Sequence, residues 1–167
     1  MKKSLIALAV LGFAGAAMAQ SSVTLYGVAD AGLGKAKSAG ETKVNMQSAG
    51  TMNNGTSRLG VRGVEDLGGG LKAGFNFETG LSLENGNTST AGAGFWGRNA
   101  NMWVGGNWGT FQMGRTLNPS FYGVAAWELT GTANYSVVAN TYGYVGGARN
   151  SSEFSYKTPD FGGLSAK

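Results

Sequence analysis

The sequence predicts an all-β fold: a transmembrane antiparallel up-and-down β-barrel, of which this chain supplies a part. Three observations lead to this prediction. Apolar and polar residues alternate with a period of two, long polar connections alternate with tight turns, and an export signal precedes the first strand. After residue 19, no stretch is apolar over the ~20 residues that a membrane-spanning helix needs.

The first 19 residues have the pattern of a secretory signal peptide. Residues 1–3 carry two lysines, residues 5–13 are apolar, and residues 17–19 form a small-x-small cleavage site. The apolar run is too short for a transmembrane anchor, which needs ~20 residues. We therefore expect export and a mature chain that begins at Gln20.

The first two predicted strands flank a polar loop. Apolar residues recur at every second position over about 22–35, which predicts one strand, and a Gly/Ser/Asn-rich loop of about 36–55 follows. In the second strand, about 57–65, Leu59 and Val61 lie on one face, while Arg58 and Arg62 lie on the other. A glycine-rich tight turn at 66–70 ends this strand.

The remaining strands continue the same alternation. The third predicted strand, 71–81, has Phe75 and Phe77 on its apolar face and Asn76 and Glu78 on its polar face, and a polar loop of about 82–97 follows it. The later elements are strands at about 98–107, 110–116 and 149–158, a turn at 158–163 and a seventh strand from Leu164. A segment of about thirty residues, 117–148, separates the fifth strand from the sixth.

The alternation fits two classes of β protein, because it does not show which face meets water. In a soluble sandwich the apolar residues would point to a shared core, whereas in a membrane barrel they point outward to lipid. The signal peptide, the glycine content (30 residues) and the asymmetric loops favour the barrel. Seven strands would leave two unpaired edges in lipid, so we expect residues 20–167 to be the N-terminal portion of a longer barrel.

The composition excludes several kinds of site. The absence of Cys and His removes disulfides, thiolate metal sites, the commonest metal ligand and any Ser-His-Asp triad from this chain. The net charge of +4 includes two lysines of the signal peptide and is too scattered to indicate a nucleic-acid partner. We expect no cofactor, no metal and no catalytic residue. Glu78 and Glu84 form a conceivable carboxylate pair, but neither local setting suggests a raised pKa.

Three segments of the chain resemble the general porins of beta-proteobacteria. These are residues 22–32, which follow the cleavage site, residues 57–73 (SRLGVRGVEDLGGGLKA), and residues 108–115 (WGTFQMGR). The resemblance implies a homotrimeric, water-filled channel of about sixteen strands per subunit in the outer membrane, in contact with lipid and lipopolysaccharide. It also implies that the segment 117–148 folds inward as a constriction loop.

Charged side chains at the constriction would set which solutes pass. Glu128 is the only ionisable group in 117–148 apart from tyrosines, and the other candidates are wall arginines. The predicted pore-lining residues are Arg58, Arg62, Arg98, Arg115, Glu128 and Arg149. Arg58 and Arg62 alternate with the apolar residues of their strand, which supports a position on the inner face. Arg98 and Arg115 fall on the same face as apolar residues of their strands, so they would point outward unless a β-bulge turns them inward. Alternatively, each arginine could be a charge outside the pore that faces solvent, lipopolysaccharide or an interface.

The resemblance implies passive diffusion of small hydrophilic solutes and ions, and the excess of arginine over acidic residues at the constriction predicts a preference for anions. Two alternatives stay open: a non-conducting adhesin or structural barrel, and a specific sugar channel, which the tyrosines of 117–148 would suit. Aromatic side chains at the ends of the strands would form interfacial girdles. The candidates are Tyr26, Phe75, Phe77, Trp103, Trp108, Phe111, Phe154 and Tyr156.

Overall fold

A computed structural model describes residues 22–38, 41–88, 94–142 and 147–167 of the chain. The predicted signal peptide, residues 1–19, lies outside this part. The main element of the described chain is a six-stranded antiparallel sheet with the strand order β1-β4-β5-β6-β7-β8. Its strands are β1 (Ser22–Val28), β4 (Arg58–Gly68), β5 (Leu71–Gly80), β6 (Asn99–Gly106), β7 (Gly109–Leu117) and β8 (Arg149–Lys157). The predicted antiparallel meander is confirmed.

The first predicted strand is wrong in its length. It ends at Val28, and the chain then forms a separate two-stranded hairpin of β2 (Gly32–Ser38) and β3 (Glu41–Gln47). β2 overlaps the end of the predicted strand, whereas β3 lies where a loop was expected. Asp30 causes the break, because its carboxylate accepts hydrogen bonds from Asn53 Nδ2 (2.8 Å) and from the Gly55 backbone N–H (2.8 Å). The alternating pattern runs through this break and therefore does not reveal it.

The segment between β7 and β8 contains two short helices that sequence periodicity did not predict. These are α2 (Pro119–Ala125) and α3 (Val137–Tyr142). Asn118 caps α2 by accepting a hydrogen bond from the Phe121 N–H (2.8 Å), and Pro119 occupies the first helical position, where a missing N–H costs nothing. Among the described residues no helix is long and apolar enough to cross a bilayer.

The predicted seventh strand at Leu164 is also wrong. The turn at 158–163 is present, but residues 164–167 form no strand. Instead they bond back to the turn, with Thr158 N–H donating to the Ala166 carbonyl (2.9 Å) and Phe161 N–H to the Leu164 carbonyl (2.9 Å). These bonds replace the ladder that a strand would make with β8.

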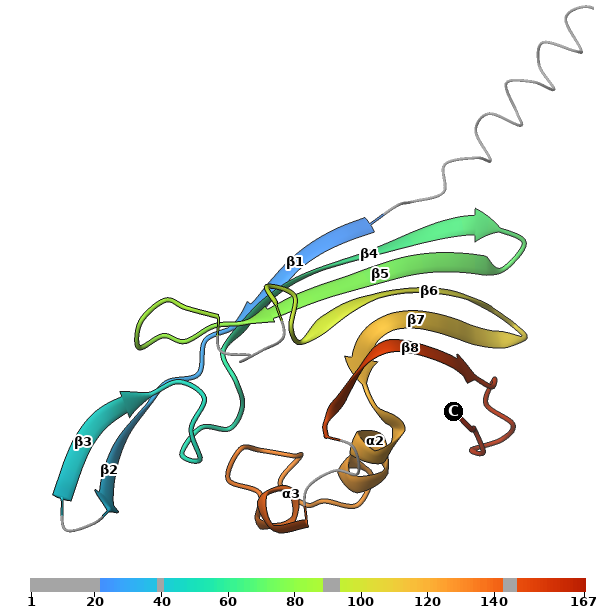
Figure 1. Cartoon of the computed structure of the whole chain (residues 1–167). Coiled ribbons are helices and arrows are strands. Elements are labelled where there is room, and N and C mark those ends of the chain that lie inside the picture. The colour runs from blue at the N-terminus through green and yellow to red at the C-terminus, as the bar shows by residue number, and fades with distance from the viewer. Residues whose placement is uncertain (1–21, 39–40, 89–93, 143–146) are drawn as a thin grey trace, which may run out of the picture.

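Long and short connections lie at opposite ends of the sheet, as the sequence predicts. Figure 1 shows a curved wall with the tight β4–β5 and β6–β7 turns at one end and the long connections at the other. The β4–β5 turn uses Gly68, Gly69 and Gly70, all at positive φ (84°, 61° and 82°), a region where side chains with a Cβ are disfavoured. Helices α2 and α3 lie on the concave side of the wall (Figure 1).

The two faces of the sheet differ in polarity. The convex, outer face carries exposed apolar side chains, including Leu25 (73% exposed), Met102 (58%) and Phe154 (69%). The inner-face residues are mostly polar: Thr24, Tyr26, Arg58, Arg62, Asn76, Glu78, Asn101, Trp103, Gln112 and Ser155. Among the described residues only one apolar residue, Ala133, is buried as a core residue would be. This is the polarity of a membrane barrel wall, since a soluble sandwich buries its apolar face.

The aromatic side chains divide between the two faces. Trp108, Phe111, Phe154 and Tyr156 form a contact cluster on the outer face near the tight turns, as expected of an interfacial girdle. Tyr26 and Trp103 do not fit this prediction. Their register places both on the inner face, opposite Gly60 and Gly74 respectively.

Candidate functional site

A cavity of about 730 Å³ lies between the inner face of the sheet, at its long-loop end, and the segment that joins β7 to β8. The sheet contributes Arg58 from β4, Glu78 from β5 and Arg149 from β8, while Arg98 comes from the residue just before β6. Residues 131–134 of the β7–β8 segment line the opposite side. Three of the six predicted site residues, Arg58, Arg98 and Arg149, thus share one cavity.

Glu78 joins two of these arginines. One carboxylate oxygen, Oε1, lies 2.6 Å from Arg98 Nε, and the other, Oε2, lies 3.7 Å from Arg58 Nε and accepts a hydrogen bond from the Tyr26 hydroxyl at 2.9 Å. Glu78 is buried at 6% exposure, so these contacts are shielded from water and hold the guanidinium groups in place. Sequence reasoning did not list Glu78 as a site residue, although its inward parity on β5 was visible.

Gly60, which has no side chain, leaves room for the Tyr26 ring to reach Glu78. Tyr26, Gly60 and Glu78 lie side by side on β1, β4 and β5. A Cβ on Gly60 would lie 2.3 Å from Cζ of the Tyr26 ring, so only glycine lets the ring cross β4 to reach Glu78. Glu84 has a separate partner, since it accepts a hydrogen bond from the Ser48 N–H at 3.2 Å.

Arg149 is the least neutralised member of the cluster. Its Nε donates to the Arg98 carbonyl at 2.9 Å, and it makes no ion pair with any carboxylate among the described residues. Asp30 also lines the cavity, but its carboxylate is occupied by Asn53 and Gly55. The Asn53 hydrogen bond, helped by the Gly55 N–H, lowers the pKa of Asp30, so that group stays ionised. Three fixed cations therefore face two engaged carboxylates.

The sequence places Arg98 and Arg115 on the apolar faces of their strands, and the structure gives a local reason why neither side chain follows that alternation. Arg98 precedes β6, so the alternation of that strand does not apply to its side chain. Arg115 lies at a register shift between Gly114 and Thr116, and its side chain donates to the Gly97 carbonyl (2.6 Å) and to Ser151 Oγ (2.7 Å). Arg115 thus lies near the cluster without lining the cavity.

Arg62 and Glu128 also lie apart from the three arginines. The Arg62 guanidinium carbon is 5.4 Å from the centre of the Tyr26 ring, and the side chain borders a separate cavity of about 390 Å³ nearer the tight turns. The Glu128 carboxylate faces its own segment. It accepts hydrogen bonds from the Thr130 N–H and hydroxyl, the Thr132 N–H and the Ser136 hydroxyl, at 2.7–3.0 Å.

These hydrogen bonds favour the ionised form of Glu128. The Thr130 hydroxyl and the Thr132 N–H are the largest contributions, and together the bonds lower the pKa of Glu128 to about 2. The carboxylate therefore organises residues 128–136 of the segment and contributes no direct contact to the arginine cavity. The same segment docks on the loop before β4, where Asn134 Nδ2 donates to the Ala49 carbonyl at 3.2 Å.

The arrangement can attract and orient anions. Arginine stays charged at any relevant pH and presents donors in a fixed plane, and here the planes are held by Glu78 and by backbone carbonyls. No cluster of three or more Asp, Glu, His or Cys residues able to hold a metal ion occurs in the described part of the chain. The geometry is that of a charged, polar opening beside an inward-folded segment.

Comparisons with known proteins give one consistent result. The sequence model of a family described as Gram-negative porin matches residues 4–167. The chain is 43% identical to outer membrane porin protein 32 of Delftia acidovorans, over 99% of this chain and 48% of that protein. It is 45% identical to an outer membrane porin protein of Bordetella pertussis, over 71% of this chain and 34% of that protein.

A solved structure agrees with these relatives. The fold resembles that of an anion-selective porin from Comamonas acidovorans, with a TM-score of 0.72 and 33% identity over 87% of this chain and 45% of that one. The chain spans about half or less of the length of each of these relatives.

Proposed function

The chain belongs to the Gram-negative porin family, and from that premise we propose that the whole protein forms a water-filled channel in the outer membrane. The channel serves the passive diffusion of small hydrophilic solutes and ions and prefers anions. It carries out no reaction on the solutes it passes. The relatives are named outer membrane porins, which supports the location and disfavours the alternative of a non-conducting adhesin or structural barrel.

One observation carries the anion preference. Arg58, Arg98 and Arg149 line a single cavity beside the inward segment, and the carboxylates in that cavity are already engaged. A fixed positive potential at a narrow place raises the local concentration of anions and repels cations. The similar structure from Comamonas acidovorans is itself described as an anion-selective porin.

The proposal assigns a role to each part of the chain. Residues 1–19 are the signal peptide, residues 20–167 are the N-terminal portion of the barrel, and residues of about 117–148 form the constriction loop. The six predicted residues divide by position. Arg58, Arg98 and Arg149 act at the constriction, Arg62 acts along the lumen wall, Arg115 supports the rim, and Glu128 shapes the loop.

The assembly is proposed from the family alone. We infer a homotrimer whose outer apolar faces contact lipid and lipopolysaccharide. Gel mobility of the unheated protein in mild detergent tests this: a trimer-sized band that collapses on heating is expected, and a monomer-sized band would contradict it.

Ion selectivity in a planar bilayer tests the function. The intact protein, purified from outer membranes in mild detergent, is inserted under a KCl gradient, and the reversal potential is recorded. We expect stable open channels whose reversal potential shows chloride to be more permeant than potassium. Cation preference would contradict the assignment of the arginine cluster, and a folded barrel without conductance would contradict the channel itself.

A further inference from the structure

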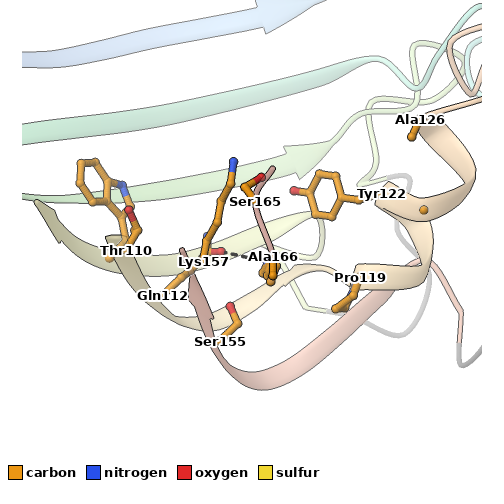
Figure 2. A pocket seen from close by; sticks show the side chains of 12 residues that line it. Thr110, Gln112, Pro119, Tyr122, Ala126, Ser155, Lys157, Ser165 and Ala166 are labelled. Atoms are coloured by element: carbon orange, nitrogen blue, oxygen red, sulfur yellow. Dashed lines mark hydrogen bonds between the residues drawn. The ribbon is translucent and has the colours of Figure 1, made fainter. Parts of the chain in front are cut away.

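A second cavity, of about 880 Å³, lies on the other side of α2, toward the tight turns. One side is the inner face of β6, β7 and β8, a second is formed by α2 and the adjoining Ala126, and a third by residues 165–167 (Figure 2). Helix α2 separates the two cavities, because Phe121 lines the arginine cavity whereas Tyr122 lines this one. The two cavities thus lie on opposite sides of α2.

Three groups in this cavity are free to contact a ligand. The Trp103 ring has no aromatic or cationic partner among the described residues. Ser155 Oγ is buried without a hydrogen-bond partner in the same part of the chain. Lys157 lines the cavity, and its ammonium group makes no ion pair within the described residues. A buried hydroxyl without a partner is costly, so its presence points to a ligand or to water.

Two other polar side chains of the cavity, Lys167 and Gln112, already have partners. Lys167 Nζ lies 3.3 Å from Glu153 Oε1 and 5.3 Å from the centre of the Tyr122 ring, so the carboxylate and that ring face are both occupied. Gln112 Nε2 donates to Asn101 Oδ1 at 3.0 Å. Lys157 is consequently the cation left for a ligand, and Trp103 is the open aromatic ring.

The backbone holds the free groups in fixed positions. Trp103, Gln112 and Ser155 are direct neighbours across β6, β7 and β8, and Lys157 is two residues from Ser155 on the same face. The Trp103 ring lies across Gly74, where a Cβ would come within 2.6 Å of the indole Cζ2, so only glycine permits this placement. A planar apolar surface thus lies beside a hydroxyl and an ammonium group that project from one rigid sheet.

We propose that this cavity is a second solute site, selective for small organic carboxylates that carry a ring. The ring would stack on Trp103, and the carboxylate would bind the Lys157 ammonium and accept a hydrogen bond from the Ser155 hydroxyl. The cavity is large enough, since a cavity of about 150 Å³ already binds benzene. The inference rests on the proposed function in placing the cavity inside an anion-preferring channel, although binding itself does not require conduction.

Saturation-transfer NMR on the detergent-solubilised protein tests binding directly, with benzoate as the ringed anion, acetate as the anion without a ring and glucose as a neutral ring. We expect saturation of benzoate only. Trp103→Leu should weaken benzoate binding about five- to tenfold. The matched control is Trp108→Leu, which removes the same ring from the outer face and should leave binding unchanged.

Lys157→Gln provides a second variant at an exposed position, so a folding defect in Trp103→Leu does not decide the result. It should weaken benzoate binding about two- to fivefold. Absence of benzoate binding would overturn the proposal. So would equal loss in Trp103→Leu and Trp108→Leu, which indicates uptake by the detergent-covered face. Glucose binding that is insensitive to Lys157→Gln would also overturn it in favour of a sugar site.

Channel recordings separate this proposal from the proposed function. In the conducting protein, benzoate added on the tight-turn side should cause brief current blocks that acetate does not cause and that Trp103→Leu shortens. Open, chloride-preferring channels without such blocks would overturn the second site alone. NMR binding that meets the expectations above, in a protein that does not conduct, would overturn the channel function and leave the site standing.

Discussion

The sheet and the segment between β7 and β8 are stabilised in opposite ways. In the sheet, apolar side chains face outward and the backbone ladder satisfies the polar groups, so its stability depends on a lipid environment. In the segment, a few buried polar side chains determine the shape: Asn118 caps α2, and Glu128 accepts four hydrogen bonds from residues 130–136. The sheet is thus specified by a periodic pattern of apolar residues, whereas the β7–β8 segment is specified by single polar residues.

This difference predicts that adjacent residues of one strand respond differently to charge. Leu25→Lys places an ammonium group on the outer face at the middle of β1 and should cost about 2–4 kcal/mol if that position lies near the bilayer midplane. Thr24→Lys, one residue away on the inner face, should cost little because that face meets water. Urea unfolding in lipid vesicles, followed by tryptophan fluorescence, measures both. Equal losses would show that the outer face does not meet lipid.

The segment should be sensitive instead to the loss of a single hydrogen-bond acceptor. Glu128→Gln keeps the shape of the side chain but cannot accept all four hydrogen bonds. We expect a severalfold increase in open-channel current noise, with an unchanged reversal potential and unchanged unfolding of the barrel. Asp160→Asn is the control, since it weakens a similar backbone hydrogen bond in the 158–163 turn. If Glu128 were instead a pore-facing charge, its neutralisation would increase the preference for chloride.

Acid should affect the segment in the same way as that substitution. The hydrogen bonds to Glu128 lower its pKa from 4.5 to about 2, so the ionised form stabilises the folded segment. This contribution is complete above pH ~4.5 and is lost as the pH falls from ~4.5 toward ~2. Current noise should therefore be constant from neutral pH to about 5 and increase below about 4. The pH dependence should be absent in Glu128→Gln, and its persistence there would assign it to another group.

A smaller loss of stability than that of Leu25→Lys is expected at the tight turns, where backbone conformation alone matters. Gly69 has φ of 61°, and a Cβ there would meet no atom within 4 Å. Gly69→Ala should therefore cost about 1–2 kcal/mol, which is the conformational penalty of the left-handed region without added clashes. Urea unfolding of the barrel measures it. A cost well above that of Leu25→Lys would show that the turn, and not the lipid-facing wall, limits stability.

Sequence reasoning succeeded where the structure follows a period. The strands around Leu59, Phe75 and Phe154, and the apolar face that each side chain shares, are visible as alternation. It failed at Asp30 and at Leu164, because a side-chain hydrogen bond or a backbone turn ends a strand without changing the alternation. The N-cap Asn118 and the first helical residue, Pro119, did carry a helix signal, but the helix is too short for periodicity to reveal it.

The charged residues of the candidate site could be predicted from the sequence, but the contacts between their side chains could not. The parity of Arg58 correctly placed it on the inner face, while the side-chain positions of Arg98 and Arg115 depend on a strand start and a β-bulge that no spacing shows. Glu78 was missed as the link between Arg58 and Arg98, because its partners come from positions distant in sequence. Glu128, expected at the pore, is engaged by its own segment.

The reversal potential of Arg58→Glu tests the central claim most directly, namely that the inner-face arginine cluster sets the ion preference. Lys35→Glu, the same charge change at an exposed residue of β2 that does not line the cavity, is the control. Under a KCl gradient, we predict that Arg58→Glu moves the reversal potential strongly toward potassium, because the substitution reverses one of three cavity cations. Lys35→Glu should leave the reversal potential close to that of the unchanged protein. An equal reversal potential in both variants would show that the cavity does not control selectivity and would contradict the account.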